Sequence, residues 1–124
     1  MGLDQRITML TKREDDTLTS TVYWLRKVNC LQGYFEEKYQ TQNCIEHGFY
    51  EDDIKELKSI TDKILQNKED HDYIESNLPP TQGFFYGSDQ IDEWYFEDVK
   101  QINEIMGKIL KTPNVEKTLY WCWY

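Results

Sequence analysis

The segment KTLYWCWY (residues 117–124) ends the chain and decides the expected fold. Its side chains alternate between two sides, Leu119, Trp121 and Trp123 against Tyr120, Cys122 and Tyr124. A period of two with aromatic residues predicts a β-strand. Because a single strand leaves its backbone groups unpaired, this segment requires a second strand elsewhere in the chain.

The segment GLDQRITML (residues 2–10) is the candidate for that second strand. Leu3, Gln5, Ile7 and Met9 alternate there with Asp4, Arg6 and Thr8. Pairing of the two ends satisfies the backbone groups of both segments. The sequence therefore predicts a small sheet in which the N- and C-terminal strands are neighbours.

Helical patterns fill the interval between these strands. Residues 17–39 carry Trp24, Val28, Leu31 and Phe35 at helical spacing, with a second apolar stripe opposite, which predicts a central helix. A connection over residues 40–48 follows. The pattern then predicts helices over 51–66, 70–76 and 90–110, the last with Asp89 as N-cap and with Trp94 among its inward-facing residues. We expect one α+β domain spanning 1–124, a small sheet covered by about three α-helices.

The net charge and composition restrict the classes of partner that the chain is expected to bind. The chain has 14 basic and 23 acidic residues, a net charge of −9, which argues against direct binding of nucleic acid or of an anionic membrane. The charge is interpreted either as a means of solubility or as an acidic face that docks on a basic protein surface. No signal peptide or apolar run of membrane-spanning length occurs, and Cys30, Cys44 and Cys122 are interpreted as reduced thiols. We expect a cytoplasmic protein.

The chain resembles a family of small proteins found widely in bacteriophages and bacterial mobile elements. The resemblance rests on the opening MGLD, on LRKVN (25–29) followed by Tyr34-Phe35, on Asn43-Cys44, and on residues 78–98. That last stretch matches the pattern LPTQSGFFFGSxxYDEWYFED. The chain departs from the family where Gln32 replaces a frequent histidine and Tyr86 replaces a third phenylalanine. The resemblance implies a phage-associated protein located in the cytoplasm of the host cell.

Asp98 and the segment 26–32 form the first candidate site. On the expected helix 90–110, Asp98 lies in the apolar arc, so its carboxylate needs a partner, and Arg26, Lys27 or a tyrosine hydroxyl is expected to supply it. Arg26, Asn29 and Gln32 make a polar seam on the expected central helix. That seam is interpreted either as a buried hydrogen-bond network or as the wall of a ligand pocket.

The loop between Gly83 and Gly87 is the second candidate. Its aromatic residues Phe84, Phe85 and Tyr86 could pack inward, cover the polar seam as a lid, or anchor a partner. We expect Phe84 or Phe85 to be buried and Tyr86 to be partly exposed.

The acidic residues Asp92 and Glu93 begin the following helix. Together with Asp89 and Glu97 they are interpreted as a solvated or partner-facing acidic surface rather than as an acid/base pair or a cation site. Cys44 and His47 have a ligand-like spacing but no second pair, so we expect no metal and no cofactor. No motif for catalysis is recognised, and no catalytic residue is predicted.

Two functions follow from these features. The first is a non-catalytic phage accessory protein that binds and modulates a host protein, for example an anti-defence or anti-CRISPR-type inhibitor. The second is a module that binds or sequesters a nucleotide-like small molecule in a pocket under the Gly83–Gly87 loop, with the base stacked on a ring and a phosphate held by arginine. The sequence leaves the oligomeric state open.

Overall fold

The structure is a computed structural model of the chain, and it describes residues 2–83 and 89–124. These residues form four strands and four helices: β1 (Asp4–Lys12), β2 (Leu18–Arg26), α1 (Asn29–Tyr39), β3 (His47–Phe49), α2 (Glu51–Gln66), α3 (His71–Asn77), α4 (Glu93–Lys111) and β4 (Val115–Trp123). Among them, no helix is both long and apolar enough to cross a membrane.

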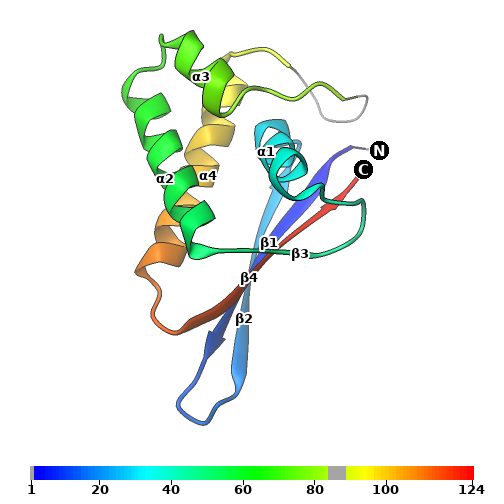
Figure 1. Cartoon of the computed structure of the whole chain (residues 1–124), viewed down its shortest axis with the longest axis vertical. Coiled ribbons are helices and arrows are strands. Elements are labelled where there is room, and N and C mark those ends of the chain that lie inside the picture. Colours follow the sequence, from blue (N-terminus) through cyan, green and yellow to red (C-terminus); the bar gives the residue numbers. More distant parts are fainter. Residues whose placement is uncertain (1, 84–88) are drawn as a thin grey trace.

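The N- and C-terminal strands lie side by side at the centre of the sheet (Figure 1). The strand order is β2-β1-β4-β3, and every neighbouring pair is antiparallel. In the register of β1 and β4, Gln5 lies opposite Cys122 and Ile7 lies opposite Tyr120. The predicted α+β class and the pairing of the two chain ends are therefore confirmed.

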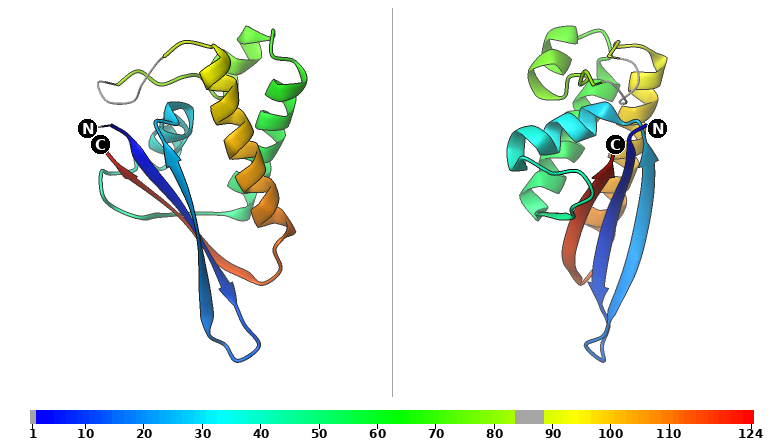
Figure 2. Two further views of the ribbon diagram at one scale, coloured as in Figure 1. Left: turned by 180° about the vertical axis from the view of Figure 1, so that it is seen from behind. Right: turned by 90° about the vertical axis from the view of Figure 1, so that its right-hand side faces the viewer.

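The helices pack against one face of the sheet and leave the other face uncovered (Figure 2). Side chains alternate along β1, so that Gln5, Ile7 and Met9 are buried under the helices while the residues between them point the other way. Phe35 of α1 stacks on Tyr120 with 4.2 Å between ring centroids. The core therefore lies between one sheet face and the helix layer.

The predicted helix over residues 17–39 is wrong in its first half. Residues 18–26 form β2, which pairs with β1 along its whole length, and the helix α1 begins only at Asn29. Lys27 separates the two elements with a left-handed φ of 57°, and its N–H donates to the carbonyl of Leu3 at 2.7 Å. A hairpin partner directly upstream favours a strand over the helical alternative that the apolar spacing suggested.

The other elements differ less from the expectation. The helix 51–66 is observed with those bounds, and the short helix lies at 71–77. The last helix begins at Glu93, because the side chain of Asp92, and not that of Asp89, accepts a hydrogen bond from the N–H of Tyr95 and caps it. The short strand β3 begins at the end of the expected connection 40–48 and includes Phe49, and the sequence analysis did not predict it.

A buried chain of hydrogen bonds joins β1, β4 and α1. The side chain of Gln5 bonds both the N–H and the carbonyl of Val28, and its Nε2 donates to the hydroxyl of Tyr120 at 2.8 Å. That hydroxyl donates in turn to Oε1 of Gln32 at 2.5 Å, and Gln32 donates to Glu36. Because each of these polar groups is paired, the chain fixes how α1 sits on the sheet.

Candidate functional site

The uncovered face of the sheet carries the most exposed aromatic surface among the strands. We call this surface the outer face; by strand alternation and register it consists of Asp4, Arg6, Thr8, Leu10, Ser20, Val22, Trp24, Arg26, Lys117, Leu119, Trp121 and Trp123. Trp24 is 62% exposed and Trp123 is 51% exposed. Exposed apolar surface of this kind on a sheet commonly marks a binding surface.

Arg6 orders the centre of the outer face. It lies opposite Trp24 on one neighbouring strand and opposite Trp121 on the other. The carbon of its guanidinium is 5.6 Å from the ring of Trp24 and 4.7 Å from that of Trp121, and the two rings meet edge to face. Its Nη2 is 2.6 Å from Glu46. Stacking and ion pairing hold the rings in place before any partner arrives.

The charge of the outer face differs from that of the whole chain. Arg6, Arg26 and Lys117 contribute three positive charges, whereas the acids close to them are Asp4, 3.8 Å from Arg26, and Glu46. Among the residues that the structure describes, Lys117 has no carboxylate within ion-pair distance. The outer face is therefore slightly basic on a chain of net charge −9.

A pocket of about 320 Å³ lies where β2, α1 and α4 meet. It brings together four of the predicted site residues, Arg26, Asn29, Asp92 and Asp98. The remaining lining residues are Lys27, Gln90, Trp94 and Tyr95. Gln32 is absent from the lining because it belongs to the buried chain of hydrogen bonds with Tyr120.

Asp98 does not form the predicted ion pair with Arg26 or Lys27. Arg26 ends a strand instead of lying on a helix; its side chain is 74% exposed and contacts Asp4. Burial, with the nearby charges of Asp92 and Glu97, raises the pKa of Asp98 to about 7. The pocket therefore contains a carboxyl group that is partly protonated near neutral pH.

The other predicted site residues have separate roles. Oδ1 of Asn29 accepts a hydrogen bond from the N–H of Thr81, which anchors the segment before the aromatic loop on α1. Thr81 also fills the space beside Gly33, where an added Cβ would lie 1.9 Å from its Oγ1. Glu93 is an exposed residue in the first turn of α4.

The predicted burial of the aromatic loop and its predicted roles as lid or partner anchor concern residues that the structure does not describe. Phe84, Phe85 and Tyr86 lie outside the residues that the structure describes. Trp94, by contrast, was expected to face inward and is 74% exposed. The buried residues Tyr95, Val99, Ile102 and Met106 define the inner side of α4, and Trp94 lies off that side.

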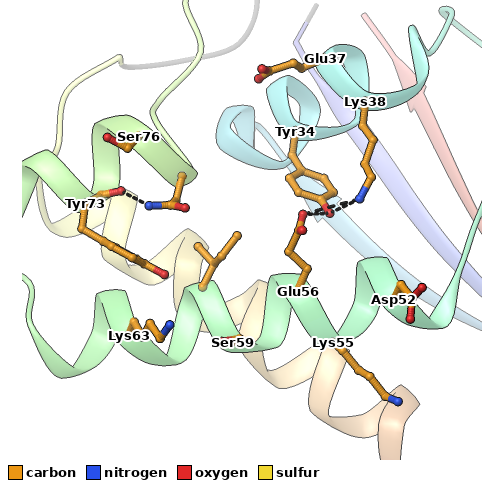
Figure 3. Close-up of a pocket in the computed structure, with 12 residues that line it drawn as sticks. Tyr34, Glu37, Lys38, Asp52, Lys55, Glu56, Ser59, Lys63, Tyr73 and Ser76 are labelled. Atoms are coloured by element: carbon orange, nitrogen blue, oxygen red, sulfur yellow. Dashed lines mark hydrogen bonds and ion pairs between the residues drawn. The ribbon is translucent and has the colours of Figure 1, made fainter.

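A wide groove between α1, α2 and α3 was not anticipated from the sequence (Figure 3). It has a volume of about 910 Å³, and Tyr34 and Lys38 of α1 point across it toward Glu56 of α2. The hydroxyl of Tyr34 donates to Glu56 at 2.6 Å, and Nζ of Lys38 is 3.6 Å from the same carboxylate. Only the crossing of two helices distant in sequence creates these pairs, so no local pattern signalled them.

Asp53 is a second carboxylate that pairs with Lys38 at this groove, and it is 2% exposed. It accepts hydrogen bonds from Lys38 at 2.5 Å, from the hydroxyl of Tyr39, and from the N–H of Tyr50 at 2.9 Å. Burial alone would raise the pKa of Asp53, but these bonds to Lys38, Tyr39 and Tyr50 lower it below its usual value. The arrangement fastens α1 to the first turn of α2, which is a structural role.

The cysteines and acidic residues form no recognisable metal centre in residues 2–83 and 89–124. Cys30, Cys44 and Cys122 are free thiols, and only Cys44 is exposed. Burial raises the pKa of Cys122 to about 11, so its thiol stays protonated at neutral pH.

Comparisons of the chain with protein-family models, with curated proteins and with solved structures found no match.

Proposed function

We propose that this chain is a non-catalytic phage accessory protein that binds a host protein through the outer face and modulates it. The observation that carries the proposal is the uncovered sheet face with its ordered tryptophans, Trp24 and Trp121 around Arg6 and Trp123 beside them. Tryptophan and arginine are the residues that most often dominate binding energy at protein interfaces. The sequence resemblance supports the phage origin, and with it an anti-defence role such as inhibition of a CRISPR nuclease.

The charges of the outer face indicate what kind of host surface fits it. A partner that buries Trp24 and Trp123 must offer apolar surface, and it must satisfy the positive charges of Arg26 and Lys117 at the rim. The matching host surface is apolar at its centre and carries carboxylates at its edge.

The test compares tryptophans that differ only in where they lie. A host protein captured on the purified chain is first identified and purified, and its affinity is then measured by calorimetry. Trp24→Ser and Trp123→Ser are expected to weaken binding at least tenfold, because each removes a large apolar contact. Trp94→Ser is the control, since Trp94 is even more exposed than Trp24 and Trp123 but lies on α4.

Two results contradict this proposal. One is the absence of any host protein that binds the chain specifically. The other is a partner whose affinity falls with Trp94→Ser and not with Trp24→Ser or Trp123→Ser.

A second candidate function is the binding of a nucleotide-like small molecule, and the pocket at Arg26, Asn29 and Asp98 favours it. Its volume of about 320 Å³ is at the lower end of the range that ligand pockets occupy. Arg26 can hold a phosphate group, and the exposed ring of Trp94 offers a surface on which a base can stack.

Titration of the chain with a panel of linear and cyclic nucleotides tests this candidate. Arg26→Ala is expected to weaken the binding of a responsive nucleotide at least tenfold, whereas Lys117→Ala is expected to leave it unchanged. Lys117→Ala is a suitable control because it also removes one positive charge from the outer face, but Lys117, unlike Arg26, does not line the pocket. Equal losses in both variants would indicate unspecific attraction to phosphate.

A further inference from the structure

The strand β2 forms an edge of the sheet without the features that usually protect an edge. It is the first strand in the order β2-β1-β4-β3, it is nine residues long, and its register with β1 runs without a bulge. From Leu18 to Leu25 it contains no charged residue and no proline. Natural edges are normally blocked by charges, prolines or bulges, because open backbone groups attract another strand.

The antiparallel pattern identifies which backbone groups of β2 are open. The bonds from Lys27 N–H to Leu3 and from Arg13 N–H to Thr17 fix the phase of the hairpin. In that phase, the odd-numbered residues of β2 bond β1, and the even-numbered residues Ser20, Val22 and Trp24 direct their N–H and C=O groups away from the sheet. The outward groups therefore form a regular row along the edge.

We propose that β2 pairs with β2 of a second copy of this chain, antiparallel, about a two-fold axis at Val22. In this register Val22 lies opposite its own counterpart, Ser20 lies opposite Trp24, and Leu18 lies opposite Arg26. All of these residues have outward backbone groups, so the edge pairs over its full length with roughly ten hydrogen bonds. The result is one continuous eight-stranded sheet with two-fold symmetry.

Charge favours a second copy in this orientation. The hairpin before β2 carries three exposed acids at residues 14–16 beside the exposed Lys12 and Arg13, so the acids prevail by one charge. The end of β2 carries exposed Arg26 and Lys27 beside Asp4, so the bases prevail there by one charge. Antiparallel pairing places the basic end of each copy beside the acidic hairpin of the other. Parallel pairing would place like charges together at both ends, which costs free energy.

The assembly keeps the outer faces on one side. Paired residues of neighbouring strands point to the same face, so Trp24 and Val22 of both copies lie on one surface that spans the two-fold axis. This inference does not depend on the proposed host partner, since it requires only the edge strand and the charges at its ends.

The first experiment measures the mass of the full chain by sedimentation equilibrium over a concentration range that reaches the millimolar level. The wild-type chain is expected to approach twice its monomer mass of 15.0 kDa. Val22→Lys places two lysines opposite each other on the axis and is expected to lower the association constant at least tenfold. Leu119→Lys is the matched control: it lies on the outer face but away from the edge, so it should leave the mass unchanged.

The second experiment determines the register of the β2–β2 pairing and does not rely on a variant that weakens the dimer. In a Cys44→Ser background, Val22→Cys is expected to form an intermolecular disulfide, because directly opposed residues have Cα atoms about 5.5 Å apart. Ser20→Cys lies about 14 Å from its own counterpart in this register and should crosslink at least tenfold more slowly.

Four outcomes would overturn the inference. The wild-type chain could keep the mass of one chain at every concentration. Leu119→Lys, rather than Val22→Lys, could dissociate the dimer, which would indicate stacking of the outer faces. Ser20→Cys could crosslink as fast as Val22→Cys, or the edge could pair only with a strand of an unrelated protein, and either would exclude the two-fold pairing at Val22.

Discussion

Asp53→Asn is expected to lower the free energy of unfolding by about 3 kcal/mol at pH 7. The carboxylate of Asp53 is buried and accepts hydrogen bonds from Lys38, Tyr39 and the N–H of Tyr50. An amide of the same shape removes the negative charge and part of this acceptor capacity, while the ammonium of Lys38 keeps only the more distant Glu56 as its counter-ion. Chemical denaturation, followed by circular dichroism, measures the change.

The pH dependence of the same variant gives an independent check. Because the pKa of Asp53 is lowered in the folded chain, its stabilising effect is present above the unfolded value near 3.8 and is lost as the pH falls through the folded pKa. The difference between wild type and Asp53→Asn should therefore shrink in acid. Asp52→Asn is the control, since it removes an exposed charge from the same helical turn and should cost less than about 0.5 kcal/mol. Equal losses in the two variants would contradict the structural role of Asp53.

Asp98→Asn is expected to act in the opposite direction and to raise the free energy of unfolding by about 2 kcal/mol at pH 8. The pKa of Asp98 is raised to about 7 in the folded chain, first by burial and then by the charges of Asp92 and Glu97. Ionisation of this carboxyl group is therefore less favourable in the folded state than in the unfolded one. A neutral amide avoids that cost, which is moderated in the wild type because Asp98 retains some contact with water.

The sign of the pH effect separates Asp98 from Asp53. A folded pKa above the unfolded value gives stability that is full below pH 4 and is lost as the pH rises toward 7. Wild type and Asp98→Asn should therefore be almost equal below pH 4, diverge as the pH rises toward 7, and keep a nearly constant difference above it. Glu104→Gln, which removes an exposed charge from the same helix, should change stability by less than about 0.5 kcal/mol. Destabilisation by Asp98→Asn at pH 8 would instead indicate an ion pair with Arg26 or Lys27.

Asp53 and Asp98 have opposite effects on the stability of the same protein. Asp53 is ionised and holds two helices together, whereas Asp98 faces a pocket as a carboxyl group that can donate as well as accept a hydrogen bond near pH 7. A ligand in that pocket would therefore meet Arg26 as a fixed donor and Asp98 as an adaptable partner.

Part of the candidate site was predictable and part was not. The sequence analysis selected Arg26, Asn29, Asp92 and Asp98, and the structure brings them to one pocket. Their mutual contacts were not predicted correctly, because Arg26 was assigned to a helix and in fact ends a strand beside Asp4. The outer face was missed altogether, since an aromatic residue in an alternating strand gives no local sign of which side the helices will cover.

The amino-acid sequence by itself determined the elements whose patterns are local and unambiguous. The alternation in residues 117–124 and 2–10 required two terminal strands that pair, and the spacing of Ile54, Leu57, Ile60 and Ile64 gave the helix 51–66 with its observed bounds. These signals suffice because a period of two or of 3.6 is dictated by backbone geometry.

Only the tertiary structure decided the segment 17–39 and the surfaces that depend on it. The spacing of Trp24, Val28, Leu31 and Phe35 is compatible with a helix. Pairing with β1 nevertheless makes residues 18–26 a strand, so that Trp24 lies on the outer face. The free energy of that pairing comes from a neighbouring strand, which no local window contains. The open edge, the ordered tryptophans and the pocket at Asp98 all follow from that one long-range choice.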